Sequence, residues 1–432
     1  MNKRITDSVY FVGALNPNLR VFDIIMAANY GTTYNAYVVK GHEKTALIET
    51  CHATYFDAFV ENIGEVCDIA ELDYIILNHL EPDHSGSLAR LSELAPKAEI
   101  ITSQAGSIYA KNITNKPDMK IRVVKQGDSV NLGGRTLQFI NAPFLHWPDS
   151  MFTYLPEEKV LFPCDFLGAH YCEPYSFDTK MNYTANYEEA FLGYYNAIFG
   201  PFKPYVLAGL DKIKDLAIDF ACTSHGPVLT RGCYLDYALE KYAQWSQPAA
   251  RSNKLLPVFY TSAYGFTRRL ANAIAQGMRD ILPDAEIECY DIIHHDMAEL
   301  HALLNACDGF AVGSPTINRD AVPPTYFLLA GADAINTAKR PVLVFGSYGW
   351  SGEAVPNIIG RVTGLKMQVY GEGYKVCFTP TEEDLARAGQ LGADFAASIS
   401  KQGIALAIQK EYTINEHLNM MSSGQGEIPD RR

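Results

Sequence analysis

One short loop constrains the fold of this chain more than any other feature of its sequence. Directly after the predicted strand Asp73–Asn78 the chain reads His-Leu-Glu-Pro-Asp-His, so four common metal-binding side chains lie within six residues: His79, Glu81, Asp83 and His84. In an extended loop alternate side chains point the same way, so His79, Glu81 and Asp83 are predicted to converge, with His84 turning in beside Asp83. A single His–Asp pair is more typical of a solvated turn, but four such groups at one strand end favour a metal site.

Three further candidate ligands each lie just past the end of a predicted strand. They are His146, after the strand Thr136–Asn141; Asp165, after Lys159–Pro163; and His225, after Asp219–Thr223. Loops at strand ends commonly carry functional residues on a rigid scaffold. Any one of the three would more often be structural, but together with the ligand-dense loop they indicate a site for two metals.

The remaining histidines lack such a setting. His170 comes shortly after Asp165 and is expected near the site, although not as a ligand. Five others lie in polar surroundings without a matching motif and are expected at the surface. These are His42, His52, His294, His295 and His301.

The pattern of the chain changes at a polar stretch that contains proline, Gln244–Asn253, and we place a linker there. Before the linker short strands mix with helices; after it, strands and helices alternate regularly, which predicts a doubly wound parallel sheet. The other strands predicted in the first part are Tyr34–Lys40, Lys44–Glu49 and Ile121–Val124, with helices at Thr54–Glu65 and Gln104–Ile113. Those of the second part are Leu255–Tyr260, Glu286–Asp291, Gly309–Ser314, Pro341–Gly346 and Gln368–Val376. The expected domains are therefore 1–248 and 254–402, followed by a partly disordered C-terminal extension, 403–432.

Three loops of the second part predict a site for a mononucleotide. Thr261–Thr267 joins a strand to a helix, and the backbone N–H groups at such a helix N-terminus attract a phosphate, although Ser and Thr there are often plain helix caps. Neither a Walker A sequence nor GxGxxG is present, which argues against ATP and dinucleotides. Two later loops end neighbouring strands, and Tyr348 and Trp350 are candidates to flank a flat ring, or else core residues. The predicted cofactor-binding residues are Ser262, Ala263, Tyr264, Gly265, Phe266, Thr267, Ser314, Pro315, Thr316, Ile317, Asn318, Ser347, Tyr348, Gly349, Trp350 and Gly352.

These motifs carry a resemblance to a known family. The order HxExDH, then His, Asp and His, resembles the metallo-β-lactamase fold, and Glu81 points to its flavodiiron branch, also called A-type flavoproteins, because hydrolases of this fold usually have His there. The second part resembles flavodoxin. The match is looser around Asp165, where the family often has Phe in place of Leu167. The resemblance covers residues 1 to about 400.

The resemblance implies an α/β protein with a metallo-β-lactamase-like αββα sandwich followed by a flavodoxin-like doubly wound parallel sheet. It implies FMN and two non-haem irons as cofactors. His79, Glu81 and His146 would hold one iron, Asp83, His84 and His225 the other, and Asp165 would bridge them. Electrons would pass from FMN to the irons, which reduce dioxygen to water or nitric oxide to nitrous oxide. A separate rubredoxin or a reduced deazaflavin would be the electron donor, and the chain would form a head-to-tail homodimer or a dimer of such dimers.

Composition narrows the function further. The formal net charge of -13 argues against nucleic-acid binding, and no segment approaches the roughly 20 apolar residues that span a bilayer. The apolar run Val9–Leu15 is expected to be a first strand, not a signal peptide. The nine cysteines are scattered without a CxxC pair, which indicates a reducing cytoplasm and no rubredoxin-like iron site.

Two other functions are compatible with parts of the sequence. A zinc hydrolase could use its flavin domain only for regulation, and a flavodoxin-like electron carrier could have an inactive first domain. Metal analysis separates the first from a diiron enzyme, and the complete set of seven candidate ligands argues against the second. The sequence leaves open the choice between dioxygen and nitric oxide, because both reactions use the same ligands.

Overall fold

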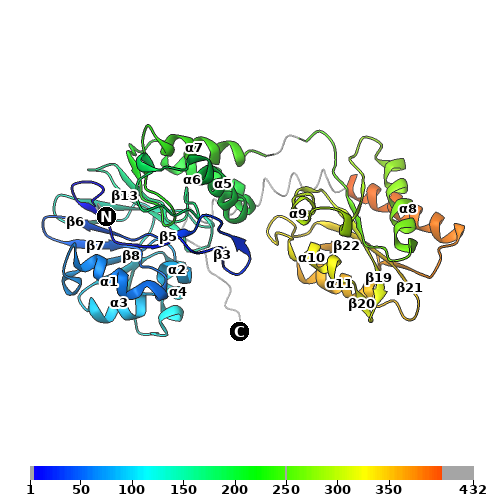
Figure 1. Cartoon of the computed structure of the whole chain (residues 1–432), viewed down its shortest axis with the longest axis horizontal. Helices are drawn as coiled ribbons and strands as arrows, with labels where there is room; N and C mark the ends of the chain where they lie inside the picture. The colour runs from blue at the N-terminus through cyan, green and yellow to red at the C-terminus, as the bar shows by residue number, and fades with distance from the viewer. Residues whose placement is uncertain (1–3, 249–250, 401–432) are drawn as a thin grey trace. The chain divides into compact units, whose positions relative to one another are not determined.

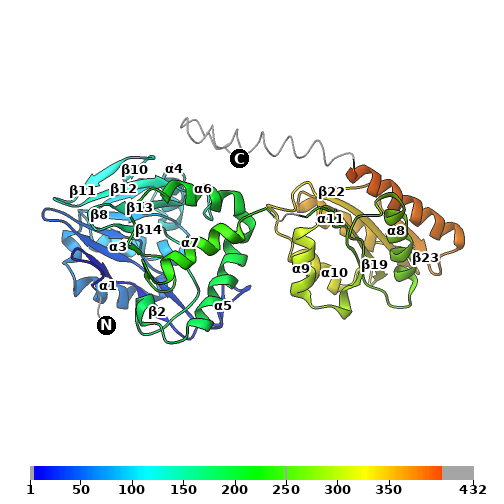
Figure 2. The same ribbon diagram turned by 90° about the horizontal axis from the view of Figure 1, so that it is seen from above.

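The computed structural model describes residues 4–248 and 251–400. The chain divides into two compact units between residues 249 and 250 (Figures 1 and 2). The predicted linker began too early, because Gln244 and Trp245 form the last turn of helix α7 (Tyr234–Trp245). The predicted limit at residue 402 and the extension 403–432 lie outside the described residues.

The first unit contains two six-stranded sheets that lie face to face. The first sheet has the order β1-β6-β7-β8-β9-β10, with β1 (Val9–Phe11), β6 (Tyr37–Lys40), β7 (Thr45–Ile48), β8 (Tyr74–Leu77), β9 (Glu99–Thr102) and β10 (Ile121–Val123). The second has the order β11 to β16, with β11 (Ser129–Asn131), β12 (Thr136–Asn141), β13 (Met151–Leu155), β14 (Val160–Phe162), β15 (Phe220–Ala221) and β16 (Leu229–Thr230). Two short antiparallel pairs complete the strands: β2 (Ala14–Asn16) with β5 (Thr32–Tyr34), and β3 (Val21–Phe22) with β4 (Met26–Ala27).

Three hydrophobic clusters explain why this unit has four layers. The middle cluster joins the inner faces of the two sheets, for example Ile76 of β8 and Phe139 of β12. A second cluster packs helices against the outer face of the first sheet, and a third packs helices against the outer face of the second. The helices are α1 (Phe56–Gly64), α2 (Pro82–Ser85), α3 (Leu88–Leu94), α4 (Gln104–Thr114), α5 (Thr184–Tyr194), α6 (Lys203–Ile213) and α7. The result is the expected αββα sandwich (Figure 1).

The second unit is a parallel sheet of order β18-β17-β19-β21-β22 with helices on both faces. Its strands are β17 (Val258–Tyr260), β18 (Cys289–Asp291), β19 (Phe310–Ile317), β20 (Asp320–Ala321), β21 (Pro341–Tyr348), β22 (Gln368–Val369) and β23 (Tyr374–Cys377). Its helices are α8 (Phe266–Ile281), α9 (Met297–Ala306), α10 (Pro323–Ala330), α11 (Ala354–Gly364) and a helix through residues 382–400. The doubly wound arrangement is confirmed.

Several strand boundaries differ from the prediction. The stretch expected as one strand from Gln368 to Val376 is two strands, because Gly371 and Gly373 adopt positive φ angles and turn the chain between them. The stretch Tyr34–Lys40 is likewise divided between β5 and β6. The apolar run Val9–Leu15, expected as one strand, is divided between β1 and β2, which belong to different sheets. Among the described residues, no helix is both long enough and apolar enough to cross a membrane.

Candidate metal centre and cofactor loops

The ligand-dense loop leaves β8 as a short helical turn, not as the extended segment that was expected. Pro82 stands at the first position of α2 (Pro82–Ser85), where its fixed φ angle suits a helix and its missing N–H costs nothing. His79 and Glu81 therefore precede the turn, whereas Asp83 and His84 lie within it. The side chains still converge in pairs: Nε2 of His79 lies 3.2 Å from Oε2 of Glu81, and Nε2 of His84 lies 3.4 Å from Oδ1 of Asp83.

The structure brings all seven predicted ligands together in two clusters. One contains His79, Glu81, His146 and Asp165, and the other contains Asp83, His84 and His225; the candidate ligand atoms within each cluster lie within 4.8 Å of one another. The two clusters combine the ends of strands from both sheets. This grouping is the one that the family resemblance implied for the two irons.

Asp165 joins the two clusters through its two carboxylate oxygens. Its Oδ2 lies 3.3 Å from Nε2 of His146 and 3.7 Å from Nε2 of His79. Its Oδ1 lies 3.1 Å from Nε2 of His84 and 3.5 Å from Nε2 of His225. One carboxylate therefore faces both clusters, as a bridge between two metals would.

The remaining carboxylates complete the two clusters separately. In the first, Oε2 of Glu81 lies 3.2 Å from Nε2 of His79 and 3.1 Å from Nε2 of His146. In the second, Oδ2 of Asp83 lies 3.0 Å from Nε2 of His225. Each cluster thus has at least one carboxylate oxygen among its imidazole nitrogens.

Unpartnered buried atoms show that this donor set fits metal cations. Both oxygens of Asp83, Oδ1 of Asp165 and Nε2 of His84 are buried without a hydrogen-bond partner. Such atoms are costly to bury unless they are paired or bind a metal. Burial acts to raise the pKa of Asp165, but the charge of His84, a hydrogen bond from His146 and the charge of His225 outweigh it and hold that pKa well below its usual value. The pocket thus favours ionised carboxylates. Two metal cations would provide the positive charge that such carboxylates need.

Neighbouring groups orient two of the imidazole rings. Nδ1 of His79 lies 3.2 Å from Oδ1 of Asp149, and Asp149 also accepts a hydrogen bond from the backbone N–H of Leu80. Nδ1 of His225 donates to the carbonyl oxygen of Thr33 at 2.6 Å. A metal-binding histidine typically gives its other ring N–H to a carboxylate or carbonyl in this way. Asp149 was not predicted, although it stands three residues after His146 in the same motif.

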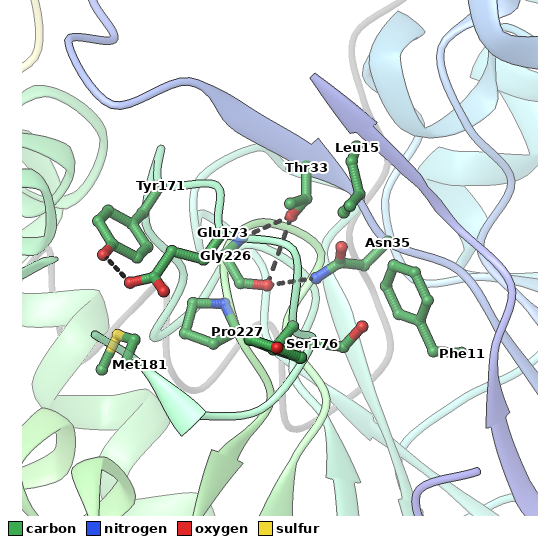
Figure 3. Close-up of a pocket in the computed structure, with 11 residues that line it drawn as sticks. Phe11, Leu15, Thr33, Asn35, Tyr171, Glu173, Ser176, Met181, Gly226 and Pro227 are labelled. Carbon is green, nitrogen blue, oxygen red and sulfur yellow. Dashed lines mark hydrogen bonds between the residues drawn. The ribbon is translucent and has the colours of Figure 1, made fainter. Parts of the chain in front are cut away.

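Strand β5 holds the loop that carries His225. The hydroxyl of Thr33 accepts a hydrogen bond from the N–H of Gly226 at 2.8 Å, and the side-chain amide of Asn35 donates to the carbonyl of Gly226 at 2.9 Å. These residues line a small pocket beside the loop, together with Glu173 (Figure 3). The pocket adds no metal-binding cluster, since its glutamate is bonded to Tyr171 and to Asn182.

Two other residues of the first unit lie at the centre without having been predicted as part of it. Burial raises the pKa of Asp23 to about 6, and its side chain also forms a hydrogen bond with Glu81. No sequence pattern marks Asp23, which lies between β3 and β4 with a φ angle of 44°. Glu49 is fully buried at the end of β7, close to His84.

The other histidines mostly lie where they were expected. His170 packs against His225 with ring centroids 5.0 Å apart, but it belongs to neither cluster and instead contacts the hydroxyl of Thr32 at 2.9 Å. His42, His294 and His295 are exposed. His52 and His301 are half-buried instead of fully at the surface, because His52 packs against Tyr34 and His301 contacts the carbonyl of Phe327.

The three predicted cofactor loops meet at one edge of the second unit's sheet. β17, β19 and β21 are adjacent and parallel, so the segments beginning at Thr261, Ser314 and Ser347 lie side by side. Gly265 caps the sixteen-residue helix α8 with a positive φ angle of 85°. The hydroxyls of Thr267 and Ser347 lie 2.8 Å apart, which joins the first loop directly to the third.

Details of these loops differ from the expectation. Pro315 to Ile317 extend β19 instead of following it, because Pro315 pairs with β21 and Thr316 and Ile317 pair with β20. Trp350 is 97% exposed, so it is not a core residue. Tyr348 is half-buried, with the ammonium group of Lys375 5.5 Å from the centre of its ring.

Comparisons with known proteins agree with both units. Residues 32–226 match the family model for the ODP family beta lactamase, and residues 258–389 match the model for flavodoxin. The chain is 52% identical over 397 residues to the flavo-diiron protein FprA2 of Clostridium acetobutylicum, covering 92% of this chain and 99% of that protein. It is 33% identical to the nitric oxide reductase of Moorella thermoacetica, covering 92% of this chain and 98% of that protein.

A solved structure shares the whole architecture. The rubredoxin oxygen:oxidoreductase from Desulfovibrio gigas is 28% identical, with a TM-score of 0.67, and the match covers 92% of this chain and 98% of that chain. The match therefore spans both units and not one of them alone.

Proposed function

Because the chain belongs to the flavo-diiron protein family, whose members are also named type A flavoproteins, we propose that it is an oxidoreductase that passes electrons from FMN to a diiron centre. The centre reduces dioxygen to water, nitric oxide to nitrous oxide, or both, and so protects against oxygen or nitrosative stress. When bound, the flavin and the iron pair would supply the redox chemistry. The protein supplies ligation, orientation and a buried pocket.

The placement of Asp165 is the observation that carries this proposal. Its two oxygens face two different clusters of imidazole and carboxylate groups, 3.1 Å from His84 on one side and 3.3 Å from His146 on the other. His79, Glu81 and His146 would hold the first iron, and Asp83, His84 and His225 the second. Asp149 and Thr33 keep the rings of His79 and His225 in place.

The flavin would lie on the loops at 261–267, 314–318 and 347–353. The N-terminus of α8 suits a single phosphate. Tyr348, which is half-buried, and the exposed Trp350 would flank the isoalloxazine, and the exposed ring of Tyr264 could also pack on it. We propose a separate rubredoxin or a reduced deazaflavin as the electron donor. We also place the protein in the cytoplasm, a proposal supported by nine cysteines that are all free thiols.

A head-to-tail homodimer, or a dimer of such dimers, is the assembly that we propose. Electron transfer requires the flavin ring near the irons, and a two-fold dimer brings the flavin of one chain to the irons of the other. Exposed apolar side chains support this assembly. Ile24 and Ile25 are 93% and 89% exposed beside the metal centre, and Tyr264 and Trp350 are exposed beside the flavin loops.

Metal analysis and gas reduction test the function together. The purified protein should contain two irons and one FMN per chain, and anaerobic rates measured with each gas and one fixed donor should show reduction of at least one. Zinc throughout after expression with ample iron, together with hydrolase activity, would favour the zinc-hydrolase alternative. Bound FMN without metal or gas reduction would favour the simple electron carrier.

A further inference from the structure

The end of strand β7 holds both ends of the ligand-dense loop. Oε1 of Glu49 accepts a hydrogen bond from the backbone N–H of Asn78 at 2.9 Å, just before His79. The backbone N–H of Thr50 donates to the carbonyl of His84 at 3.1 Å, and the hydroxyl of Thr50 donates to the same carbonyl. Glu49 therefore holds the loop where it begins, at Asn78, and Thr50 holds it at its last candidate ligand, His84.

Glu49 is held there in an unusual way. Its φ angle is 62°, in the left-handed region that is rare for residues other than glycine. Such a conformation persists only where the surrounding structure requires it, and it is frequent near functional sites. The side chain is buried in the interior of the unit, 1% exposed, and its Oε2 has no hydrogen-bond partner.

Glu49 lies beside His84, a candidate ligand of the second cluster. A carboxylate oxygen of Glu49, the sulfur of Cys164 and a ring nitrogen of His84 lie within 4.8 Å of one another. His79 and His225 each have a partner at Nδ1, namely Asp149 and the carbonyl of Thr33. Nε2 of His84 faces Asp165 and Asp83, so its other ring N–H is the group that needs an acceptor.

We propose that Glu49 is a positioning residue for the diiron centre, acting through His84. Its carboxylate accepts the ring N–H of His84 that does not face the metal, and so keeps Nε2 directed at the cluster formed with Asp83 and His225. This role parallels that of Asp149 toward His79. The inference rests on the proposed function, since it assumes that a metal occupies the second cluster.

Glu49→Gln tests the proposal with little change in volume. An amide has one acceptor oxygen and one NH2 group. If the oxygen accepts the N–H of Asn78, the NH2 group faces His84 and the contact with the ring N–H is lost; if the amide is turned round, the contact with Asn78 is lost. We expect the affinity of the second iron to fall about 10- to 100-fold, the usual cost of losing such a partner, while the first iron stays tightly bound. Competition with a chelator, followed by iron analysis, measures both affinities; thermal unfolding of the metal-free proteins checks that the variant folds.

A double-mutant cycle with His84→Ala tests whether Glu49 acts through the ring of His84. If Glu49 acts through His84, Glu49→Gln should add nothing once the imidazole is gone. The matched control is Asp149→Asn, which should weaken the first iron and remain additive with His84→Ala. If Glu49→Gln does not fold, Glu49→Asp takes its place; it keeps the carboxyl group but draws it back from the ring, so a smaller loss of the second iron is expected.

The possible outcomes separate this inference from the proposed function. A wild-type protein that does not bind two irons contradicts the function itself. Two irons in the wild type with unchanged affinities in the folded Glu49 variant overturn the positioning role alone. An effect of Glu49→Gln that adds to that of His84→Ala also overturns the positioning role. A third metal per chain that is lost in the Glu49 variant overturns it too, since Glu49 would then be a metal ligand.

Discussion

At the scale of single residues, the metal centre depends on very few atoms. Asp165 contributes to both clusters, whereas each of the other six candidate ligands contributes to one. Removing a side chain that serves one cluster leaves the other intact, but removing Asp165 takes an oxygen from each. The residues of the centre are therefore not equivalent.

Asp165→Ala is accordingly expected to be the most damaging single change. The variant should fold but lose most of its iron, because Asp165 offers one oxygen to each cluster and none of the other six candidate ligands serves both. Elemental analysis measures the loss. Asp219→Ala is the matched control, since that carboxylate is half exposed, forms an ion pair with Lys159 and belongs to neither cluster; this variant should keep both irons. One tightly bound iron in Asp165→Ala would show that this residue does not bridge.

The N-terminus of α8 should attract the phosphate of FMN, and a negative charge added to the loop before it should repel that phosphate. Ser262→Asp places a negative side chain where the phosphate is expected, and we expect FMN affinity to fall at least about 100-fold, because like charges brought together cost several kcal/mol. Ser262→Ala removes only a hydroxyl and should cost about tenfold. Fluorescence titration of the flavin-free protein compares the two. Tight FMN binding by Ser262→Asp, or a released cofactor that is FAD, would contradict the predicted pocket.

The sequence predicted the identity of the candidate ligands better than their surroundings. Seven residues that follow strand ends could be found from residue type and position alone, and the structure gathers all seven. Asp149, Glu49 and Asp23 were missed as neighbours of the centre, since a carboxylate that supports a ligand carries no spacing signal of its own. Glu49 was assigned only to the end of a strand, and its left-handed backbone has no mark in the sequence.

At the scale of helices and strands, the elements with strong periodicity were predicted and the turns were not. Strand β12 begins and ends where the sequence predicted a strand, at Thr136 and Asn141. The helical turn at Pro82 was taken as extended chain, because four residues are too few to show a helical period. The short strands β22 and β23 were predicted as one strand, Gln368–Val376, because each is too short to show a period of its own.

One glutamate ties the N-terminal segment to the second sheet and should make stability depend on pH. Glu158 accepts hydrogen bonds from the hydroxyl of Thr6, the N–H of Ser8 and Nε of Arg135. Burial acts to raise the pKa of Glu158, but these hydrogen bonds outweigh it and leave the pKa below the usual 4.5. A folded-state pKa below the unfolded value stabilises the protein above about pH 4.5, and this stabilisation disappears as the pH falls through the folded-state pKa.

Glu158→Gln should therefore unfold more easily than the wild type at pH 7, with the difference shrinking below about pH 4. Urea unfolding at several pH values measures this difference. Glu157→Gln is a suitable control, because Glu157 accepts one hydrogen bond, from the N–H of Thr136. A difference between Glu158→Gln and wild type that is independent of pH would mean that the charge of Glu158 does not stabilise the fold.

At the scale of the whole molecule, the proposed dimer predicts that two defective chains can complement each other. A chain with Asp165→Ala lacks irons, and a chain with Ser262→Asp lacks FMN, so each homodimer should be inactive. A mixed dimer should regain about half of the wild-type activity per dimer, because it contains one intact flavin facing one intact iron pair. Differently tagged chains purified in tandem allow the measurement. A mixed dimer that forms and retains its cofactors but stays inactive would show that electrons travel within one chain.

The metal centre draws its ligands from both sheets of the first unit, since His79 follows β8 of one sheet and His225 follows β15 of the other. Two metal ions held between these ligands would link the two sheets. A metal that binds only the folded state raises the free energy of unfolding by mass action. Chains made when iron is scarce would open more often and expose cleavable backbone to cellular proteases. The amount of this protein in a cell should then follow iron supply even at constant synthesis, so that its lifetime becomes a measure of the metal it carries.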